Sequence, residues 1–344
     1  MNATMSLEKT KHYPVMLDQI LSIISPQHGG DFIDCTFGGG GYSKAILKYP
    51  NTKVFALDRD KIAQKYADYL LKTFPTRFHF SKNKFSNLSK IISPDLKPRA
   101  IIFDLGLSSN QLADPERGFS FKSKKSINME MGINKYSAYD VVNKLDQKKL
   151  ANIIKILGEE KDGKIIARKI VKYRSEKPIQ TSEELASIIN DAKIKKGYKK
   201  NPSTKTFQAI RIFVNEELTE LITGLIIAAK ILKEGGILAV VSFHSLEDKI
   251  VKNFFKLYSG LNKNPSRYVP LQKSNSNLFK FFTKKAQVPK NKEVEENIRS
   301  RSAKLRFAIR NNNPFFFPED FKKKFENYFK FEEVILWQLT LING

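Results

Sequence analysis

Acidic residues end three of the short apolar segments that the sequence predicts as strands. Asp34 closes the segment that starts at Phe32, Asp58 follows residues 54–57, and Asp104 follows residues 100–103. In an open parallel sheet, ligands bind at the carboxyl ends of the strands. A carboxylate at such a position can accept hydrogen bonds from ligand hydroxyl groups, those of a ribose among them. The three acids therefore predict one ligand site at one edge of a sheet.

A glycine-rich turn, residues 38–41, separates the first two predicted strands. A helical segment from about 42 to 48 follows it, so that residues 31–60 read as strand, turn, helix and strand. Glycine lets a backbone approach a ligand closely because it has no Cβ. Asp58 lies about 20 residues after the first glycine, where nucleotide-binding sheets place their ribose acid. The pattern predicts the first half of a nucleotide-binding sheet.

The glycine-rich turn is compatible with two kinds of nucleotide cofactor. A dinucleotide-binding enzyme needs a third glycine after two residues, and Ser43 stands at that position. S-adenosylmethionine (SAM) has no pyrophosphate to cradle, and SAM enzymes typically carry an acid before the glycines, as Asp34 does here. The turn favours SAM over a nicotinamide cofactor.

Charge is the clearest compositional signal. The chain has 344 residues with 60 Lys and Arg against 35 Asp and Glu, a formal net charge of +25. Such a surplus favours a polyanionic partner, most simply nucleic acid. A bias of the genome toward Lys codons would give a similar composition without binding.

Several classes of protein are disfavoured. No long apolar run predicts a transmembrane helix, and no apolar segment near residue 1 resembles a secretory signal, which favours the cytoplasm. One cysteine, Cys35, excludes an internal disulfide, and four scattered histidines offer no metal-ligand spacing. We therefore expect no bound metal. A homodimer is compatible with the sequence.

Periodicity predicts an α/β sheet domain interrupted by a helical insertion. Strands are predicted at 77–80, 237–242 and 304–310 in addition to those above, and helices at 138–146, 147–157, 162–174, 181–192, 204–215 and 216–232. Thr181 and Glu184 form a capping-box signature. Residues 106–136 and 259–297 are predicted as loops. The expected division is a sheet domain at 1–108 and 216–310, an insertion at 109–215, and a C-terminal extension at 311–344 with a helical character.

Eight collinear segments carry a family resemblance. They are HYPVML (12–17), DCTFGGGGYS (34–43), FS (85–86), DLGLSS (104–109), ERGFSF (116–121), NPSTKTFQAIRIFVN (201–215), SFHSLEDKIVK (242–252) and NIRSRSAKLR (297–306). Over roughly residues 10–310 the chain resembles the ribosomal RNA small subunit methyltransferase H family, the cytosine-N4 methyltransferases of 16S rRNA. The resemblance implies a Rossmann-like SAM-dependent methyltransferase sheet with an inserted all-helical substrate domain. It also implies methylation of a cytidine N4 amino group in the decoding region of the small ribosomal subunit.

The resemblance also implies the cofactor contacts. By matching position, SAM is held by Gly40, Gly41, Tyr42, Asp58, Phe85, Asp104 and Gln111. Two positions depart from the family pattern, which has a histidine at 42 and an arginine at 39. Tyr42 can still contact SAM through its backbone.

Two residues are candidates for catalysis. Asp104 can touch SAM or accept a hydrogen bond from the target amino group, and capping the next turn is its structural alternative. His244 can accept a proton after methyl transfer, or it can be a structural histidine.

Aromatic and basic residues outside the glycine turn are candidates for RNA contact. Phe119 and Phe121 can stack on the target base or simply pack their loop. The proposed phosphate contacts are Arg117, Arg211, Lys195, Lys196, Lys199 and Lys200, for which a solvated turn or a hinge is the alternative. The competing classes are a nicotinamide-dependent oxidoreductase and an RNA-binding protein without catalytic activity.

Overall fold

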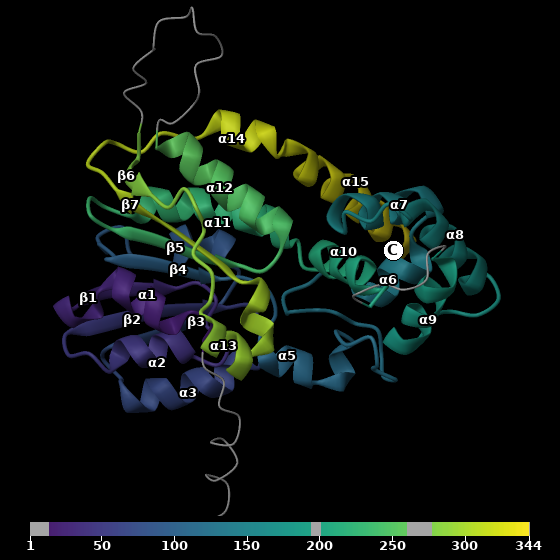
Figure 1. Ribbon diagram of the computed structural model, residues 1–344, viewed down its shortest axis with the longest axis horizontal. Coiled ribbons are helices and arrows are strands. Elements are labelled where there is room, and N and C mark those ends of the chain that lie inside the picture. The colour runs from purple at the N-terminus through teal and green to yellow at the C-terminus, as the bar shows by residue number, and fades with distance from the viewer. Residues whose placement is uncertain (1–13, 194–200, 260–276, 344) are drawn as a thin grey trace, which may run out of the picture. The chain divides into compact units, whose positions relative to one another are not determined.

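The chain folds as two compact units, each built from two separate stretches of sequence (Figure 1). The computed structural model describes residues 14–193, 201–259 and 277–343. The sheet unit comprises Met1–Gly106 and Ile222–Phe321, and the helical unit comprises Leu107–Leu221 and Lys322–Gly344. Among the described residues, no helix has the length and apolar character needed to span a membrane.

The sheet unit is built on seven strands in the order β3-β2-β1-β4-β5-β7-β6. Five are parallel: β1 (Gly30–Asp34), β2 (Thr52–Asp58), β3 (Phe78–Lys82), β4 (Ala100–Asp104) and β5 (Ile237–Ser242). The strands β7 (Lys304–Arg310) and β6 (Phe279–Phe282) complete the sheet as antiparallel neighbours. The strand order reverses between β1 and β4, the point at which such sheets bind ligands. The Rossmann-like fold class predicted from the sequence is confirmed.

Helices cover the sheet because its central strands, above all β4 and β5, are apolar and buried along nearly their whole length. The helices of the sheet unit are α1 (Leu17–Ile24), α2 (Gly41–Leu47), α3 (Ala63–Thr73), α4 (Leu88–Ile91), α12 (Ser245–Tyr258), α13 (Asn291–Glu296) and α11 (Glu217–Ile231), whose first residues up to Leu221 belong to the helical unit. A fully buried cluster joins Ile20 of α1 and Ile46 of α2 to Phe32, Val54 and Ile102 of the central strands. This packing fixes the carboxyl ends of β1, β2 and β4 in one rigid frame.

The predicted loop over 259–297 contains two elements that periodicity did not reveal, β6 and α13. The strand is only four residues long, and lysine interrupts its apolar pattern, so no alternation was visible. Phe279 is nevertheless fully buried, and its ring lies edge-on to Phe255 with the centroids 5.6 Å apart. This one anchor, together with pairing to β7, fixes the strand.

The insertion is helical, as its periodicity predicts, except that the predicted loop at 106–136 contains one short α-helix, α5 (Ser109–Ala113). The other helices of the insertion are α6 (Ala138–Lys144), α7 (Gln147–Leu157), α8 (Gly163–Arg174), α9 (Ser182–Ala192) and α10 (Thr204–Val214). α8 packs against α7 and α9, and α10 packs against α7. The predicted cap of α9 is confirmed: the Glu184 amide donates to the Thr181 hydroxyl over 3.1 Å, and the Glu184 carboxylate accepts from the Thr181 amide over 3.2 Å.

The C-terminal extension forms two helices, α14 (Glu319–Lys324) and α15 (Glu326–Asn343). α15 belongs to the helical unit, where Ile335 and Leu339 are fully buried. Its buried Glu332 accepts a 2.6 Å hydrogen bond from the Thr219 hydroxyl. Both apolar and polar contacts therefore hold α15 within this unit.

We predict that Leu339→Ala lowers the free energy of unfolding of the helical unit by about 2–5 kcal/mol, because a fully buried leucine leaves a cavity. Val334→Ala on the same helix is the matched control, since Val334 is 56% exposed and should change stability by less than about 0.5 kcal/mol. Urea unfolding followed by circular dichroism measures both. Equal effects would show that α15 is not part of the core.

Candidate active site

Three carboxylates meet at the carboxyl edge of the sheet. Asp34, Asp58 and Asp104 are the last residues of β1, β2 and β4. β1 pairs with both other strands in parallel, so the three strand ends lie side by side at one edge. The three acids therefore share one edge of the sheet, and ligand binding at this edge stays a prediction.

Two of the carboxylates hold the glycine turn. Asp34 is fully buried; its Oδ2 accepts a 2.7 Å hydrogen bond from the Ser43 hydroxyl, and its Oδ1 accepts from the Thr36 amide. Asp58 Oδ2 accepts from the Gly38 amide over 2.7 Å. Sequence reasoning treated Ser43 only as a missing glycine, whereas its hydroxyl ties α2 to β1. An acid nine residues before a serine is too weak a signal to reveal this contact.

Glycine is required in the turn for both conformation and space. Gly40 has φ 78°, and a Cβ there would lie 2.8 Å from the Phe37 ring. A Cβ on Gly41 would lie 2.4 Å from Pro14. Neither contact is tolerated by a real side chain, so substitution would displace the turn.

Asp104 is the carboxylate without a protein partner on one oxygen. Its Oδ1 is buried and has no hydrogen-bond partner among the described residues. The Asp104 backbone amide donates to the Thr36 hydroxyl over 2.7 Å, so the strand end itself is fixed. A buried carboxylate oxygen without a partner is costly, and a ligand donor would remove that cost.

Burial raises the pKa of all three carboxyl groups. The pKa values of Asp34 and Asp58 rise to about 6, and that of Asp104 rises well above its ordinary value because of burial and the negative charges of Asp34 and Glu247. No basic side chain of the described residues forms an ion pair with them. A positive charge on a ligand would lower these pKa values and favour the ionised form of the carboxyl groups, which accepts hydrogen bonds.

Tyr42 and Phe85 have clear packing roles beside the predicted cofactor contacts. Tyr42 is buried, and its hydroxyl donates to the Val15 carbonyl, so its backbone is the part left for a ligand. Phe85 is half-buried and lies edge-on to Phe103, with ring centroids 5.3 Å apart. A Cβ on Gly224 would approach the Phe85 ring to 2.6 Å, so this glycine makes room for Phe85.

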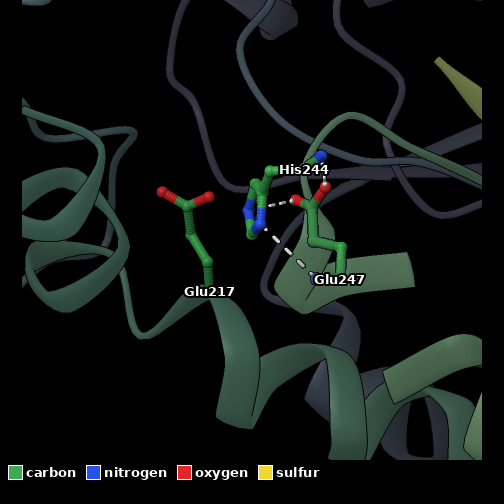
Figure 2. Close-up of side chains that lie close together, drawn as sticks. All are labelled: Glu217, His244 and Glu247. Carbon is green, nitrogen blue, oxygen red and sulfur yellow. Dashed lines mark hydrogen bonds and ion pairs between the residues drawn. The ribbon is translucent and has the colours of Figure 1, made fainter. Parts of the chain in front are cut away.

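His244 caps helix α12 (Figure 2). Its Nδ1 accepts from the Glu247 backbone amide over 3.4 Å, while the buried Glu247 carboxylate accepts from the amides of Phe243 and His244. The imidazole Nε2 lies 3.1 Å from Glu247 Oε1, a distance that gives an ion pair when the ring is protonated. The histidine thus has a structural function, and its part in proton transfer stays a prediction.

The predicted contacts in the helical unit also have internal partners. Gln111 closes a capping box with Ser108, accepting from the Ser108 amide over 2.8 Å. Phe119 is buried beneath the Arg117 guanidinium. Phe121 lies edge-on to Phe207 at 4.9 Å.

The two arginines predicted to contact phosphate, Arg117 and Arg211, already bind groups of the protein itself. Arg117 donates to the Glu130 carbonyl, and Arg211 makes a bidentate pair with Glu217 at 2.8 and 2.7 Å. Lys195, Lys196, Lys199 and Lys200 lie outside the described residues. RNA contact by all six residues stays a prediction.

Comparison with known proteins identifies the family. A doubly wound sheet with an acidic site at its switch point is typical of nucleotide-dependent transferases and oxidoreductases. Residues 9–311 match the model of the MraW methylase family, and the chain belongs to that family. This membership argues against the oxidoreductase alternative. The extension containing α15 lies beyond the matched range.

Relatives of similar length agree with this assignment. The chain is 44% identical over 301 residues to the ribosomal RNA small subunit methyltransferase H of Rickettsia canadensis, covering 86% of this chain and 97% of that protein. Against the protein of the same name from Ehrlichia canis it is 43% identical, covering 87% and 99%.

Among solved structures, the chain is similar to a methyltransferase from Streptococcus mutans in complex with S-adenosylhomocysteine (SAH), with a TM-score of 0.39 at 13% identity, covering 88% of this chain and 99% of that one.

The raised pKa of Asp34 predicts a pH dependence of stability without ligand. Between its ordinary value of 3.8 and about 6, the folded state holds a proton that the unfolded state has lost. Stability from this group is therefore present below pH 4 and is lost as the pH rises through 6, by on the order of 3 kcal/mol.

Asp34→Asn should reduce this loss, because the amide stays neutral while retaining an oxygen acceptor. Urea unfolding at pH 4.5 and pH 7 measures the difference, with the exposed Asp95→Asn as control. A pH profile that is unchanged in Asp34→Asn would contradict the predicted ionisation.

Proposed function

We propose that the protein is a SAM-dependent methyltransferase that methylates the N4 amino group of a cytidine in the decoding region of 16S rRNA. Membership of the methylase family and the names of its relatives support transfer to small-subunit rRNA. The observation that carries the proposal is the buried, unpartnered Oδ1 of Asp104 at the switch point of the sheet. The substrate is the small ribosomal subunit or its RNA, in the cytoplasm.

The residues of the sheet unit fit SAM. Asp58 retains acceptor capacity for ribose hydroxyls, because each of its oxygens accepts a single backbone amide, from Gly38 and from Asp60. The backbone of Gly40, Gly41 and Tyr42 borders the same edge. The acids match the positive charge of a sulfonium, and Phe85 offers an apolar surface. Gln111 of the helical unit is the remaining proposed contact.

When bound, SAM supplies a methyl group activated by its sulfonium charge. The cytosine amino group is a poor nucleophile because its lone pair is delocalised into the ring. Asp104 can accept a hydrogen bond from an amino N–H and so favour the pyramidal nitrogen that attacks. A nearby positive charge lowers the pKa of this carboxyl toward its ordinary value and so favours the accepting form.

Alignment supplies most of the remaining rate, because an in-line displacement depends on donor and acceptor geometry. The strand ends that carry Asp34, Asp58 and Asp104 are rigid, which holds the acceptor in one position. After transfer the amine proton is acidic enough to pass to water or to His244. A homodimer is not needed for any of these roles.

We predict that Asp104→Ala reduces methylation of small-subunit RNA by about 100-fold or more, because the acceptor for the amino N–H is lost. Asp95→Ala, an exposed change in the same unit, should leave turnover unchanged. Transfer of labelled methyl from SAM to RNA measures both variants. Wild-type turnover by Asp104→Ala would refute the role of this carboxylate.

The position of the methyl group tests substrate specificity. We expect digestion of the modified RNA and mass spectrometry to place the methyl on the exocyclic nitrogen of one cytidine in the decoding region. A methyl on carbon 5, on a ribose, or on another base would contradict the proposal.

A further inference from the structure

A basic groove runs along helix α12 in the sheet unit. Its volume is about 400 Å³, and four lysines line it: Lys249, Lys252, Lys256 and Lys304. None of them is among the RNA contacts predicted from the sequence.

The helix holds its three lysines in fixed positions. Lys249, Lys252 and Lys256 recur at helical spacing on one exposed face. The other face carries Phe254 and Tyr258, which are fully buried. The backbone beneath the lysines is thereby fixed in the core, while their ammonium groups face solvent.

The charges of the three α12 lysines are not neutralised by the protein. Asp248 is the acid in the lining of the groove, and it already pairs with Arg306 Nε at 2.7 Å and with Lys304 at 3.2 Å. Among the described residues, the three α12 lysines form no ion pair. Like charges one turn apart on a helix repel each other, so an anionic partner would stabilise this face.

The groove starts at the edge of the sheet that carries Asp104. Asp104 pairs with Val241 of β5, and the next residue, Ser242, pairs with Lys304 of β7. α12 begins at Ser245, just after β5. Lys304 and the start of the lysine face are therefore next to the strand end where the target base is expected.

The lysine face has the length of a short stretch of nucleic acid backbone. Lys256 lies seven positions after Lys249 on the helix, a rise of about 10 Å. Phosphates follow each other at a rise of about 3.4 Å per strand in a duplex, so this face can contact at least two of them.

We propose that Lys249, Lys252, Lys256 and Lys304 bind the phosphate backbone of the substrate RNA beside the target nucleotide. The inference rests on the proposed function for the identity of the polyanion. It assigns to the sheet unit a share of the RNA binding that the sequence had suggested only for the insertion. Lysine serves as a point charge for phosphate and reads no base, so the groove positions the strand without specifying its sequence.

The test is a triple variant, K249Q/K252Q/K256Q, compared with a matched variant, K48Q/K65Q/K72Q. Both remove three exposed lysines of the sheet unit and change net charge equally. Binding of a single-stranded rRNA fragment from the decoding region is measured over a series of salt concentrations. Titration with SAM and thermal unfolding check that both variants keep the cofactor site and the fold.

We expect the groove variant to lose affinity for RNA about tenfold or more at low salt and its log–log salt slope to decrease by about 2, since each lost phosphate contact contributes about 0.7. The matched variant should stay within about twofold of wild type, and SAM affinity should be unchanged in both. In methylation assays the groove variant should raise KM for RNA and leave kcat unchanged. Equal losses in the two variants, or no loss in the groove variant, would overturn the proposal.

Failure of this inference is distinguishable from failure of the proposed function. If the wild-type protein methylates the RNA and the groove variant binds it normally, only the groove is refuted. If the wild-type protein neither binds SAM nor methylates RNA, the proposed function is refuted directly.

Discussion

The structure depends on the burial of three carboxylates at one edge of a parallel sheet. Asp34, Asp58 and Asp104 occupy adjacent strand ends, and burial raises the pKa of each. Hydrogen bonds from Ser43 to Asp34 and from Gly38 to Asp58 offset part of the free energy that burial of these two carboxylates costs. The third retains an unpartnered oxygen, which makes it the residue whose environment a ligand would change most.

The same constraint explains why methyl transfer suits this site. A sulfonium brings a positive charge and no phosphate, so a group of acids without a basic partner is complementary to it. The glycine turn serves the fold as well as the ligand, since Gly40 and Gly41 are packed against Phe37 and Pro14. The acids are held by strands whose apolar faces form the core, and their separation is therefore fixed before any ligand arrives.

Features set by residues close together in the chain could be predicted from the sequence, and features set by contacts between distant residues could not. The parallel strands, the insertion helices and the Thr181 cap follow from hydrophobic spacing and capping chemistry, which act over a few residues. β6 was not predicted because it is defined by one buried phenylalanine and by its pairing to β7. The hydrogen bond between Ser43 and Asp34, and the cap made by His244, depend on contacts that only the folded chain creates. The lysines of α12 stand at helical spacing in the sequence. Only the structure shows that they line a groove and that the acid in this groove, Asp248, already pairs with Arg306.

α12 illustrates how one element serves packing and electrostatics together. Its aromatic face closes the core against Phe279, its N-terminus is capped by His244, and its lysine face meets solvent. The helix therefore leads from the strand end near Asp104 to a charged surface. One helix can do both because helical periodicity places the aromatic and the lysine side chains on different faces.

The central claim is that the buried acids form a site for a cationic methyl donor. Calorimetric titration of the protein at pH 6 with SAM and with SAH, in buffers of different ionisation enthalpy, tests it most directly. We predict saturable binding of both, with more protons released by SAM, because its sulfonium lowers the pKa of the neighbouring carboxyl groups. No saturable binding, or equal proton release by the charged and neutral ligands, would contradict the account.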